Sequence, residues 1–430
     1  MAGSARPTFD MAKEIKPCGA VDATLTLPGS KSYTHRALVA AALAEGESVL
    51  SNALRAEDTE LTAQALARLG AGIDWQGTDI RVQGAGGRWR PVVEPIYLGN
   101  SGTSMRFLTA LVALGQGTYR LTGTARLCQR PLGELLRALE QLGAQAASER
   151  GDGCPPVLVL GGLRGGRARL SGAVSSQYVS ALLFIGPLAP EGVEIVITDE
   201  LVSRPYVDLT LAVLEDFGIS YYREGYRFFR VLSGQPYQPG AYAIEADASS
   251  ASYFWAAAAI TGGKVTIANL SAASCQGDAA FPGVLERMGC TLESGEAGLT
   301  VQGGPLTGIS VDLAAMPDLV PTLAVVGAFA RGETSITGVA HLRHKESDRL
   351  AAVATELQKM GIAARETADG LIIPGGAPHG AAIDTYEDHR LAMSFAVAGL
   401  KTPGLVINNP GCVAKSFPDF WKYFDKLCQG

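Results

Sequence analysis

Hydrophobic and polar positions along the chain fall into short alternating runs, typical of strands, and longer runs with a helical period. A helical run that ends in an apolar residue and a glycine recurs five times, at Gly70, Gly143, Gly218, Gly289 and Gly361. The spacings between these glycines are 73, 75, 71 and 72 residues. Glycine is favoured just after a helix because it adopts the left-handed conformation without a Cβ penalty. The pattern therefore predicts an internal repeat of about 72 residues.

Each predicted repeat contains more than this helix end. Two short strand-like runs follow the glycine, and a short strand, a small or polar loop and an alanine-rich helix come earlier in the repeat. One repeat thus has the order strand, helix, strand, helix, strand, strand. Every α/β protein alternates strands and helices, but five helix-end glycines in phase favour a true repeat. The six predicted starts are Thr24–Ala44, Ile96–Leu114, Ala168–Leu188, Ala241–Thr261, Ile309–Ala330 and Ala382–Gly399.

The six repeats predict two domains of three repeats each. The sixth repeat ends after its second helix and lacks its last two strands, and the N-terminal stretch Thr8–Cys18 can supply strand material for it. We therefore expect one domain over residues 22–240, with repeats one to three. The other domain is expected to combine residues 1–21 with 241–430. The chain would cross between the domains twice, near Val21 and Gly240.

Composition narrows the class of protein. Charged residues are 18% and apolar residues 47% of the chain, and 52 residues are glycine, which excludes a disordered chain and argues against a coiled coil. The net charge of −6 gives no basic surface for nucleic acid. The seven cysteines are scattered without a CxxC pair, so a disulfide scaffold or zinc site is not expected. No apolar run reaches membrane-spanning length and the N-terminus lacks the apolar stretch of a secretory signal, so we expect a soluble, cytoplasmic protein.

Polar loops at the predicted helix starts carry most of the candidate chemistry. The loop that ends at Arg36 places Lys31 and Ser32 beside a helix N-terminus, whose N–H groups favour an anion. Taken alone, such a loop is equally well explained by a solvated lysine and a capping serine. Comparable loops occur at matched positions of other repeats. The cations at these junctions are Lys31, Arg36, Arg130, Lys345, Arg349, Arg390 and Lys415.

The matched positions of these cations predict that they converge where the two domains face each other. A cleft with several Lys and Arg side chains in an acidic protein suits small polyanions. Asp318 and Glu346 lie among the cations along the chain and supply acid–base groups. The sequence contains no GxxxxGK[ST] phosphate loop. These patterns predict two anionic substrates and proton transfer, with no metal.

Eight segments, in order along the chain, resemble the 5-enolpyruvylshikimate-3-phosphate (EPSP) synthase family. They are LPGSKSYTHRAL, LGNSGTSMRFL, QRPLG, SSQYVSALL, LVSRPYVDLTL, HKESDRL, YEDHRLAMSF and AKSFPDFW. Each segment alone is weakly specific, but the ordered set covers the chain from about residue 10 to its end. The resemblance implies an inside-out α/β barrel: two similar domains, each of three βαβαββ units, joined by two hinge crossings. The predicted repeats and hinges agree with that fold independently.

The resemblance also implies a reaction. In this family the 5-hydroxyl of shikimate 3-phosphate adds to C2 of phosphoenolpyruvate while C3 is protonated, and phosphate then leaves the tetrahedral intermediate. The family uses no metal and no organic cofactor, and its members belong to the shikimate pathway of aromatic amino acid biosynthesis. A monomer is expected.

The resemblance assigns substrate contacts to matching positions of this chain. Those implied for shikimate 3-phosphate are Lys31, Ser32, Arg36, Ser175, Ser176, Gln177, Ser203, Tyr206, Asp318, His341 and Lys345. Those implied for phosphoenolpyruvate are Lys31, Asn100, Gly102, Arg130, Gln177, Arg349, Arg390 and Lys415. Asp318 is implied as the base for the 5-hydroxyl. Either Glu346 or Lys31 is implied as the proton carrier at C3.

Three residues depart from the usual family pattern. His341 stands where Asn is more frequent, His35 replaces a more familiar Asn, and Phe107 replaces a smaller residue or proline. None of the three removes a charged group from the implied site. Gly102 leaves room beside phosphoenolpyruvate, so we also expect inhibition by glyphosate.

Two other functions are compatible with parts of the pattern. A UDP-N-acetylglucosamine enolpyruvyl transferase shares the fold and typically has a reactive cysteine near the second repeat, where Cys128 lies. It would also show Lys-Asn in place of Lys31-Ser32, and the Ser175–Gln177 triplet suits a sugar phosphate better. A non-catalytic anion-binding module on the same scaffold would not require Asp318 and Glu346.

Overall fold

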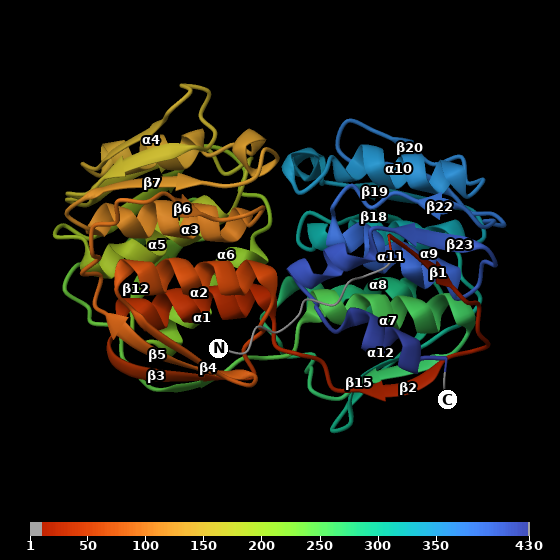
Figure 1. The fold of residues 1–430 in the computed structure, drawn as a ribbon. Coiled ribbons are helices and arrows are strands. Elements are labelled where there is room, and N and C mark those ends of the chain that lie inside the picture. The colour runs from red at the N-terminus through yellow and green to blue at the C-terminus, as the bar shows by residue number, and fades with distance from the viewer. Residues whose placement is uncertain (1–10, 429–430) are drawn as a thin grey trace. The chain divides into compact units, whose positions relative to one another are not determined.

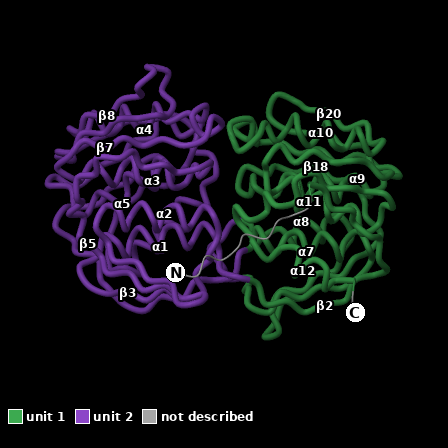
Figure 2. Tube along the Cα trace, in the orientation of Figure 1, with its two compact units in different colours: residues 1–27, 248–272, 278–430 green, residues 28–247, 273–277 purple. Residues whose placement is uncertain are grey.

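The computed structural model describes residues 11–428, and the chain forms two compact units (Figure 2). Unit 1 consists of the residues up to 27, residues 248–272 and the residues from 278 onward. Unit 2 consists of residues 28–247 and 273–277. In the part of the chain that the structure describes, no helix is both long and apolar enough to cross a membrane.

Unit 2 contains three four-stranded sheets of one design (Figure 1). In each sheet the first strand runs parallel to the second, and the remaining two strands form an antiparallel hairpin beside them. One sheet has the spatial order β14 (Ala241–Ala243), β3 (Glu45–Ser51), β5 (Asp79–Ala85) and β4 (Gly72–Gln76). The next has the order β6 (Ile96–Tyr97), β7 (Thr118–Thr122), β9 (Val157–Leu160) and β8 (Gln145–Ser148). The third has the order β10 (Gly166–Leu170), β11 (Val193–Ile197), β13 (Phe228–Val231) and β12 (Tyr221–Glu224). Its helices are α1 (Lys31–Leu43), α2 (Glu57–Leu69), α3 (Gly102–Leu111), α4 (Gly133–Gln141), α5 (Gln177–Ile185) and α6 (Pro205–Asp216).

Unit 1 repeats the design with one shorter sheet. One sheet has the spatial order β2 (Asp22–Leu25), β15 (Lys264–Ile267), β17 (Gly298–Gln302) and β16 (Thr291–Gly295). The next has the order β18 (Ser310–Asp312), β19 (Glu333–Thr337), β21 (Leu371–Pro374) and β20 (Arg365–Glu366). The shorter sheet has the order β22 (Ala382–Ile383), β23 (Leu405–Asn408) and β1 (Ala12–Ile15). Its helices are α7 (Ala248–Thr261), α8 (Phe281–Arg287), α9 (Val320–Ala328), α10 (Arg349–Lys359), α11 (His389–Gly399) and α12 (Phe420–Lys426). The N-terminal strand β1 pairs antiparallel with β23 and completes the last sheet, as expected for the stretch up to Cys18; Thr8–Asp10 lie outside the described residues.

Helices form the centre of each unit. In unit 1, α7, α9 and α11 pack against one another, and all nine residues of α9 are buried. In unit 2, α3 packs against both α5 and α1. A helix that is apolar on all sides must be surrounded by other elements, which explains why these alanine-rich segments lie inside and the sheets outside. Each unit is an α/β barrel turned inside out, with three repeats as the sequence predicts.

The glycines that revealed the repeat have the conformation expected of helix ends. Gly70, Gly143, Gly218, Gly289 and Gly361 all have positive φ, at 118°, 92°, 77°, 113° and 82°. They follow α2, α4, α6, α8 and α10, and each precedes an antiparallel hairpin. The predicted period of about 72 residues is therefore confirmed as a structural repeat.

The structure differs from the sequence interpretation at the two crossings. The strand near Thr24 was expected in the first repeat and the strand from Ala241 in the fourth, but β2 pairs with β15 in unit 1 and β14 pairs with β3 in unit 2. We call this the strand exchange. The chain consequently changes unit after Leu27 and Asp247, not near Val21 and Gly240. A strand's own sequence does not show which sheet it joins, so the repeat pattern could not reveal the exchange.

The crossing segments lie beside each other where they enter unit 2. Gly29 forms an antiparallel bridge with Ala246, and the Ser30 N–H donates to the Glu245 carbonyl at 2.7 Å. A Cβ at Gly29 would lie 1.8 Å from the backbone oxygen of Asn52, so only glycine fits at this point. The close approach fixes the start of α1, which carries the first candidate residues.

Candidate active site

The candidate residues gather at helix starts within each unit. Lys31 and Gln177 are the first residues of α1 and α5, and Arg349 is the first residue of α10. Ser30 and Asp388 cap α1 and α11 by accepting hydrogen bonds from the first-turn N–H groups of Tyr33 and Arg390. Helix N-termini carry partial positive charge, so these positions favour anions, as the loop patterns predict.

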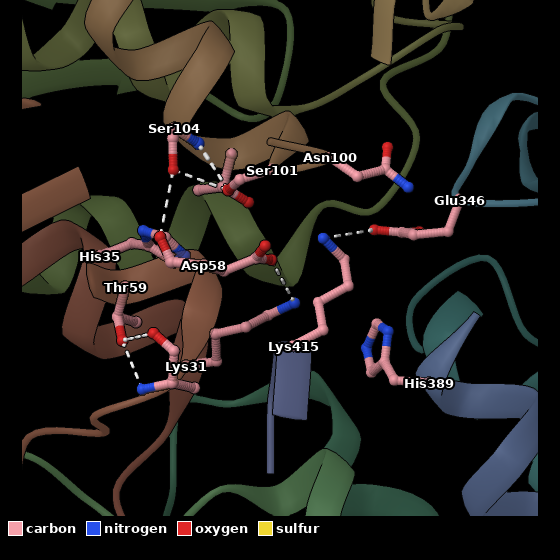
Figure 3. A network of polar contacts seen from close by, with 12 residues as sticks. Lys31, His35, Asp58, Thr59, Asn100, Ser101, Ser104, Glu346, His389 and Lys415 are labelled. Atoms are coloured by element: carbon pink, nitrogen blue, oxygen red, sulfur yellow. Dashed lines mark hydrogen bonds and ion pairs between the residues drawn. The ribbon is translucent and has the colours of Figure 1, made fainter. Parts of the chain in front are cut away.

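Lys31 is oriented by two aspartates of unit 2. Its backbone N–H donates to Asp247 Oδ2 at 2.8 Å, and its Nζ donates to Asp58 Oδ2 at 3.3 Å (Figure 3). Asp58 is buried in the first turn of α2, where the helix dipole stabilises a carboxylate. Neither aspartate is among the residues predicted from the sequence. The acidic first turn of α2 was a signal that could have identified Asp58.

Arg36 is enclosed by the protein. Its side chain is buried, with Nε donating to Thr210 Oγ1 at 2.8 Å and the two terminal nitrogens donating to the carbonyls of Ser32 and Tyr206 at 2.9 Å. Burial lowers the pKa of Arg36 to about 10, because its hydrogen-bond partners are neutral. The predicted group of Arg36, Ser32 and Tyr206 is thus brought together, and Arg36 joins the start of α1 to the start of α6.

Gly102 lies directly beneath two guanidinium groups. A Cβ at this position would come within 2.6 Å of Arg130 Nη2 and Arg106 Nη1. Arg130 donates to the Asn100 carbonyl at 3.3 Å, and Arg106 donates to Gln177 Oε1 at 2.9 Å. The structure therefore groups four predicted phosphoenolpyruvate residues and adds Arg106, which the sequence analysis quoted within a motif but did not select.

The serines of unit 2 serve partly as local backbone partners. Ser175 Oγ accepts from the Gln177 N–H at 3.3 Å, and Ser176 precedes α5 and is buried. Ser203 is buried and has a positive φ of 53°, a conformation that a non-glycine residue rarely adopts. Such outliers concentrate at sites where the backbone is held for function, which supports keeping Ser203 among the candidates.

In unit 1 the candidates form one ion-pair cluster. Its members are Asp318, Glu346, Arg349, Asp388, Arg390 and Lys415. Arg349 donates to Asp318 Oδ1 at 2.8 Å, to Glu346 Oε2 at 2.9 Å and to Asp388 Oδ2 at 2.8 Å. Arg390 Nη2 donates to Asp318 Oδ2 at 2.7 Å. Asp388, which the sequence analysis did not select, therefore holds Arg349 from the start of α11.

Glu346 lies between two cations of this cluster. Its Oε2 pairs with Arg349, and its Oε1 is 4.0 Å from Lys415 Nζ (Figure 3). Lys415 is the last residue of the 3-10 turn Pro410–Lys415, and both side chains are buried. A carboxylate in such a position is a candidate proton carrier.

His341 lies in the 3-10 turn Ala340–His344, close to Lys345. Burial, and to a smaller extent the charge of Lys345, lowers the pKa of His341 to about 3. The imidazole is neutral at neutral pH and offers one donor and one acceptor, as the amide of asparagine does. The departure from the family's Asn at this position therefore conserves hydrogen-bonding capacity.

The other two departures are packing residues. Phe107 is buried, with its ring edge-on to Phe184 at 5.4 Å, and the Arg36 guanidinium lies 5.4 Å from its centroid. His35 is buried, and its Nδ1 is 2.9 Å from Thr62 Oγ1. Both side chains help to hold α1 in place.

Cys128 is also enclosed. Its thiol donates to the Gly123 carbonyl at 3.7 Å and the residue is buried in the 3-10 turn Leu127–Gln129. Among the described residues, no three His, Cys, Asp or Glu side chains are grouped so that they could hold a metal ion.

Comparisons with known proteins agree on one family. The family model described as EPSP synthase (3-phosphoshikimate 1-carboxyvinyltransferase) matches residues 15–424. A 3-phosphoshikimate 1-carboxyvinyltransferase of Syntrophobacter fumaroxidans is 47% identical over 97% of this chain and its own full length. One from Methanoculleus marisnigri is 45% identical over 96% of this chain and 98% of its own. An EPSP synthase structure from Acinetobacter baumannii superposes with a TM-score of 0.80 at 30% identity, covering 97% of this chain and 98% of its own.

Proposed function

The chain belongs to the EPSP synthase (3-phosphoshikimate 1-carboxyvinyltransferase) family, and we propose that the side chains described above divide that family's reaction among themselves. The reaction transfers the enolpyruvyl group of phosphoenolpyruvate to the 5-hydroxyl of shikimate 3-phosphate and releases phosphate. The observation that carries the proposal is the match over residues 15–424, which includes every candidate residue. The names of the relatives do not favour the UDP-N-acetylglucosamine alternative.

Shikimate 3-phosphate is held chiefly by residues of unit 2 in this proposal. They are Lys31, Ser32, Arg36, Ser175, Ser176, Gln177, Ser203 and Tyr206, with Asp318, His341 and Lys345 from unit 1. The charge of Arg36 is not balanced by a carboxylate within the described residues, which suits a ligand that brings a phosphate. Main-chain and hydroxyl groups at the starts of α1, α5 and α6 add donors for the phosphate and the ring hydroxyls.

Phosphoenolpyruvate is held by cations of both units in this proposal. They are Lys31, Arg130, Arg349, Arg390 and Lys415, with Asn100, Gly102 and Gln177. Guanidinium groups match carboxylate and phosphate geometry, and lysines supply point charges beside them. Gly102 keeps the guanidiniums of Arg130 and Arg106 close to the main chain, because any side chain would displace them.

The proton transfers fall to the carboxylates of unit 1 and to Lys31. Asp318 takes the proton of the 5-hydroxyl as its oxygen attacks C2, and Glu346 or Lys31 donates a proton to C3. The same carrier takes a proton back from C3 as the C2–O bond to phosphate breaks. General acid–base groups of this kind contribute about 10²–10⁴-fold to a rate.

Phosphate release tests the proposal. We expect release from phosphoenolpyruvate and shikimate 3-phosphate together, without added metal, and none when either is omitted. Release with UDP-N-acetylglucosamine in place of shikimate 3-phosphate would refute the assignment and favour the related transferase, in which alkylation of Cys128 should also abolish activity. A protein that binds both anions without releasing phosphate would be a binding module.

Three further properties follow from the family resemblance and are proposed with it. We expect a monomer in solution, location in the cytoplasm and inhibition by glyphosate. Light scattering measures the first, fractionation of the source cells the second, and the inhibition constant the third.

A further inference from the structure

Asp318 bridges two arginines in the ion-pair cluster of unit 1. Its Oδ1 accepts from Arg349 Nη1 at 2.8 Å, and its Oδ2 accepts from Arg390 Nη2 at 2.7 Å. These are two of the arginines proposed to hold phosphoenolpyruvate. One carboxylate with each oxygen on a separate guanidinium is the contact that a substrate carboxylate would make with them. Asp318 therefore occupies, from within the protein, the position of a carboxylate ligand.

The other aspartate on Arg349 is built differently. Asp388 is fully buried, caps α11 through the Arg390 N–H, and accepts a further hydrogen bond from Ser347 Oγ at 3.0 Å. The side chain of Asp318 is 17% exposed and sits in the short turn Pro317–Leu319 before α9. Asp388 is thus fixed by several partners within unit 1, and Asp318 is the more exposed of the two carboxylates.

The charges of the cluster are matched while Asp318 is in place. Three cations, Arg349, Arg390 and Lys415, face three carboxylates, Asp318, Glu346 and Asp388. A ligand carboxylate that reached Arg349 and Arg390 with Asp318 still in place would lie beside a like charge, which is unfavourable. Departure of Asp318 removes that repulsion and leaves both arginines to the ligand carboxylate.

We propose that Asp318 is an internal competitor for the carboxylate of phosphoenolpyruvate. In the absence of that substrate Asp318 is tied to Arg349 and Arg390; when phosphoenolpyruvate docks, its carboxylate takes the two arginines and Asp318 is released toward the 5-hydroxyl. The inference rests on the proposed function of these residues. It makes the base available only when phosphoenolpyruvate is bound.

Competition of this kind lowers apparent affinity. A ligand that binds only the state with Asp318 displaced has its affinity reduced by the fraction of that state in the free protein. Removing the Asp318 carboxylate should therefore tighten phosphoenolpyruvate binding, although it removes a group proposed to act in catalysis. A residue that simply contacted the substrate would give the opposite result.

The experiment is calorimetric titration of phosphoenolpyruvate into the protein without shikimate 3-phosphate, so that no turnover occurs. We expect Asp318→Asn and Asp318→Ala to bind about fivefold or more tightly than the wild type, within the usual range for coupled equilibria. Asp388→Asn should bind more weakly, because Arg349 loses its fixed partner. Thermal unfolding of each variant verifies that it is folded. Unchanged or weaker binding by both folded Asp318 variants would overturn the inference.

A matched variant separates displacement from a simple loss of negative charge. Glu346→Gln removes a carboxylate that pairs with Arg349 and Lys415, whereas Asp318 pairs with Arg349 and Arg390. Charge alone predicts equal tightening in Glu346→Gln and Asp318→Asn, and that outcome would contradict displacement. A clearly larger effect for Asp318→Asn supports it.

Failure of the inference is distinguishable from failure of the proposed function. Phosphate release by the wild type, with unchanged binding in the Asp318 variants, leaves the function standing and removes the competitor. Tightened binding without phosphate release from both substrates retains the competitor and removes the transferase assignment.

Discussion

Arg36 in unit 2 and Arg349 in unit 1 are both only 1% exposed, yet their surroundings differ in charge. Arg36 donates to a hydroxyl and two carbonyls, and burial lowers its pKa to about 10. Burial acts on the pKa of Arg349 in the same direction, but the three carboxylates around it outweigh burial and raise its pKa above the usual value. The charge of Arg36 is therefore not compensated by its partners, whereas carboxylates compensate the charge of Arg349.

The difference between Arg36 and Arg349 suits the different anions that we propose for the two units. An arginine with neutral partners can gain an anionic ligand without losing an ion pair, which suits the phosphate of shikimate 3-phosphate. An arginine with carboxylate partners must exchange one of them, which suits phosphoenolpyruvate if Asp318 leaves. In the proposed function, Arg36 thus provides a standing site for an anion in unit 2, and Arg349 provides a site in unit 1 where an anion replaces a carboxylate, the exchange site.

The largest effect is expected on turnover, from a substitution of Asp318 in the exchange site. Asp318→Asn should lower kcat by about 10²–10⁴-fold, the usual range for a general base. Shikimate 3-phosphate binding should persist, because most of its proposed contacts lie in unit 2. Steady-state phosphate release and equilibrium binding measure the two properties. Near-normal turnover would refute the assignment of the base.

The next effect is on stability. It compares the loss of a charged partner of Arg349 with the loss of a neutral partner of Arg36. Asp388→Asn should lower the free energy of unfolding by about 3–5 kcal/mol, the range for removing one partner of a buried ion pair. Thr210→Val, which removes a neutral partner of Arg36, should cost about 1–3 kcal/mol. Urea unfolding of both variants provides the test. Equal losses would mean that the carboxylates around Arg349 are not decisive.

A smaller effect is expected at the glycine beneath Arg130. The methyl group of Gly102→Ala would meet the Arg130 and Arg106 guanidiniums at 2.6 Å, and these flexible ends must shift. We expect the KM for phosphoenolpyruvate to rise and the glyphosate inhibition constant to rise further, by about tenfold or more, equivalent to about 1.4 kcal/mol. Inhibition assays of both proteins compare the constants. Equal inhibition constants would show that the inhibitor does not approach Gly102.

The smallest effect concerns the neutral imidazole in unit 1. His341 takes up a proton below pH 6.5 when unfolded, but only below about pH 3 when folded. Between these values the unfolded chain binds more protons, so stability falls as the pH falls. His341→Asn should make that fall shallower, by at most about 1.4 kcal/mol per pH unit. Urea unfolding from pH 8 to 5 tests this: the two proteins should have parallel profiles above pH 7 and diverge below. Parallel profiles throughout would contradict the shift.

The local features of the molecule could be predicted from sequence. Helix-end glycines such as Gly70 and capping residues such as Ser30 act within a few residues of themselves, so their spacing revealed the repeat. The cations of the site were found because they stand out in a chain that is only 18% charged. The family motifs then supplied the roles that spacing could not.

The features that were missed depend on distant partners. Asp388 lies beside Arg349 although 39 residues separate them, and Asp247 accepts from Lys31 across 216 residues. The strand exchange is of the same kind, since β2 and β14 are both short strands and their partners β15 and β3 lie far away in the chain. Whether a cation is already paired is decided by such contacts, and composition alone does not reveal it.

The pairing of β1 with β23 has a consequence for the order in which the chain is made. Ala12 and Asn408 are partners although they are 396 positions apart in the chain. At about 5–20 residues per second, β1 waits roughly 20–80 s for β23, its partner strand. All of unit 2 is synthesised in that interval, and its sheets can close from residues 28–247 without waiting for β23. Synthesis therefore favours unit 2 as the first to fold, and β1 as one of the last strands to pair.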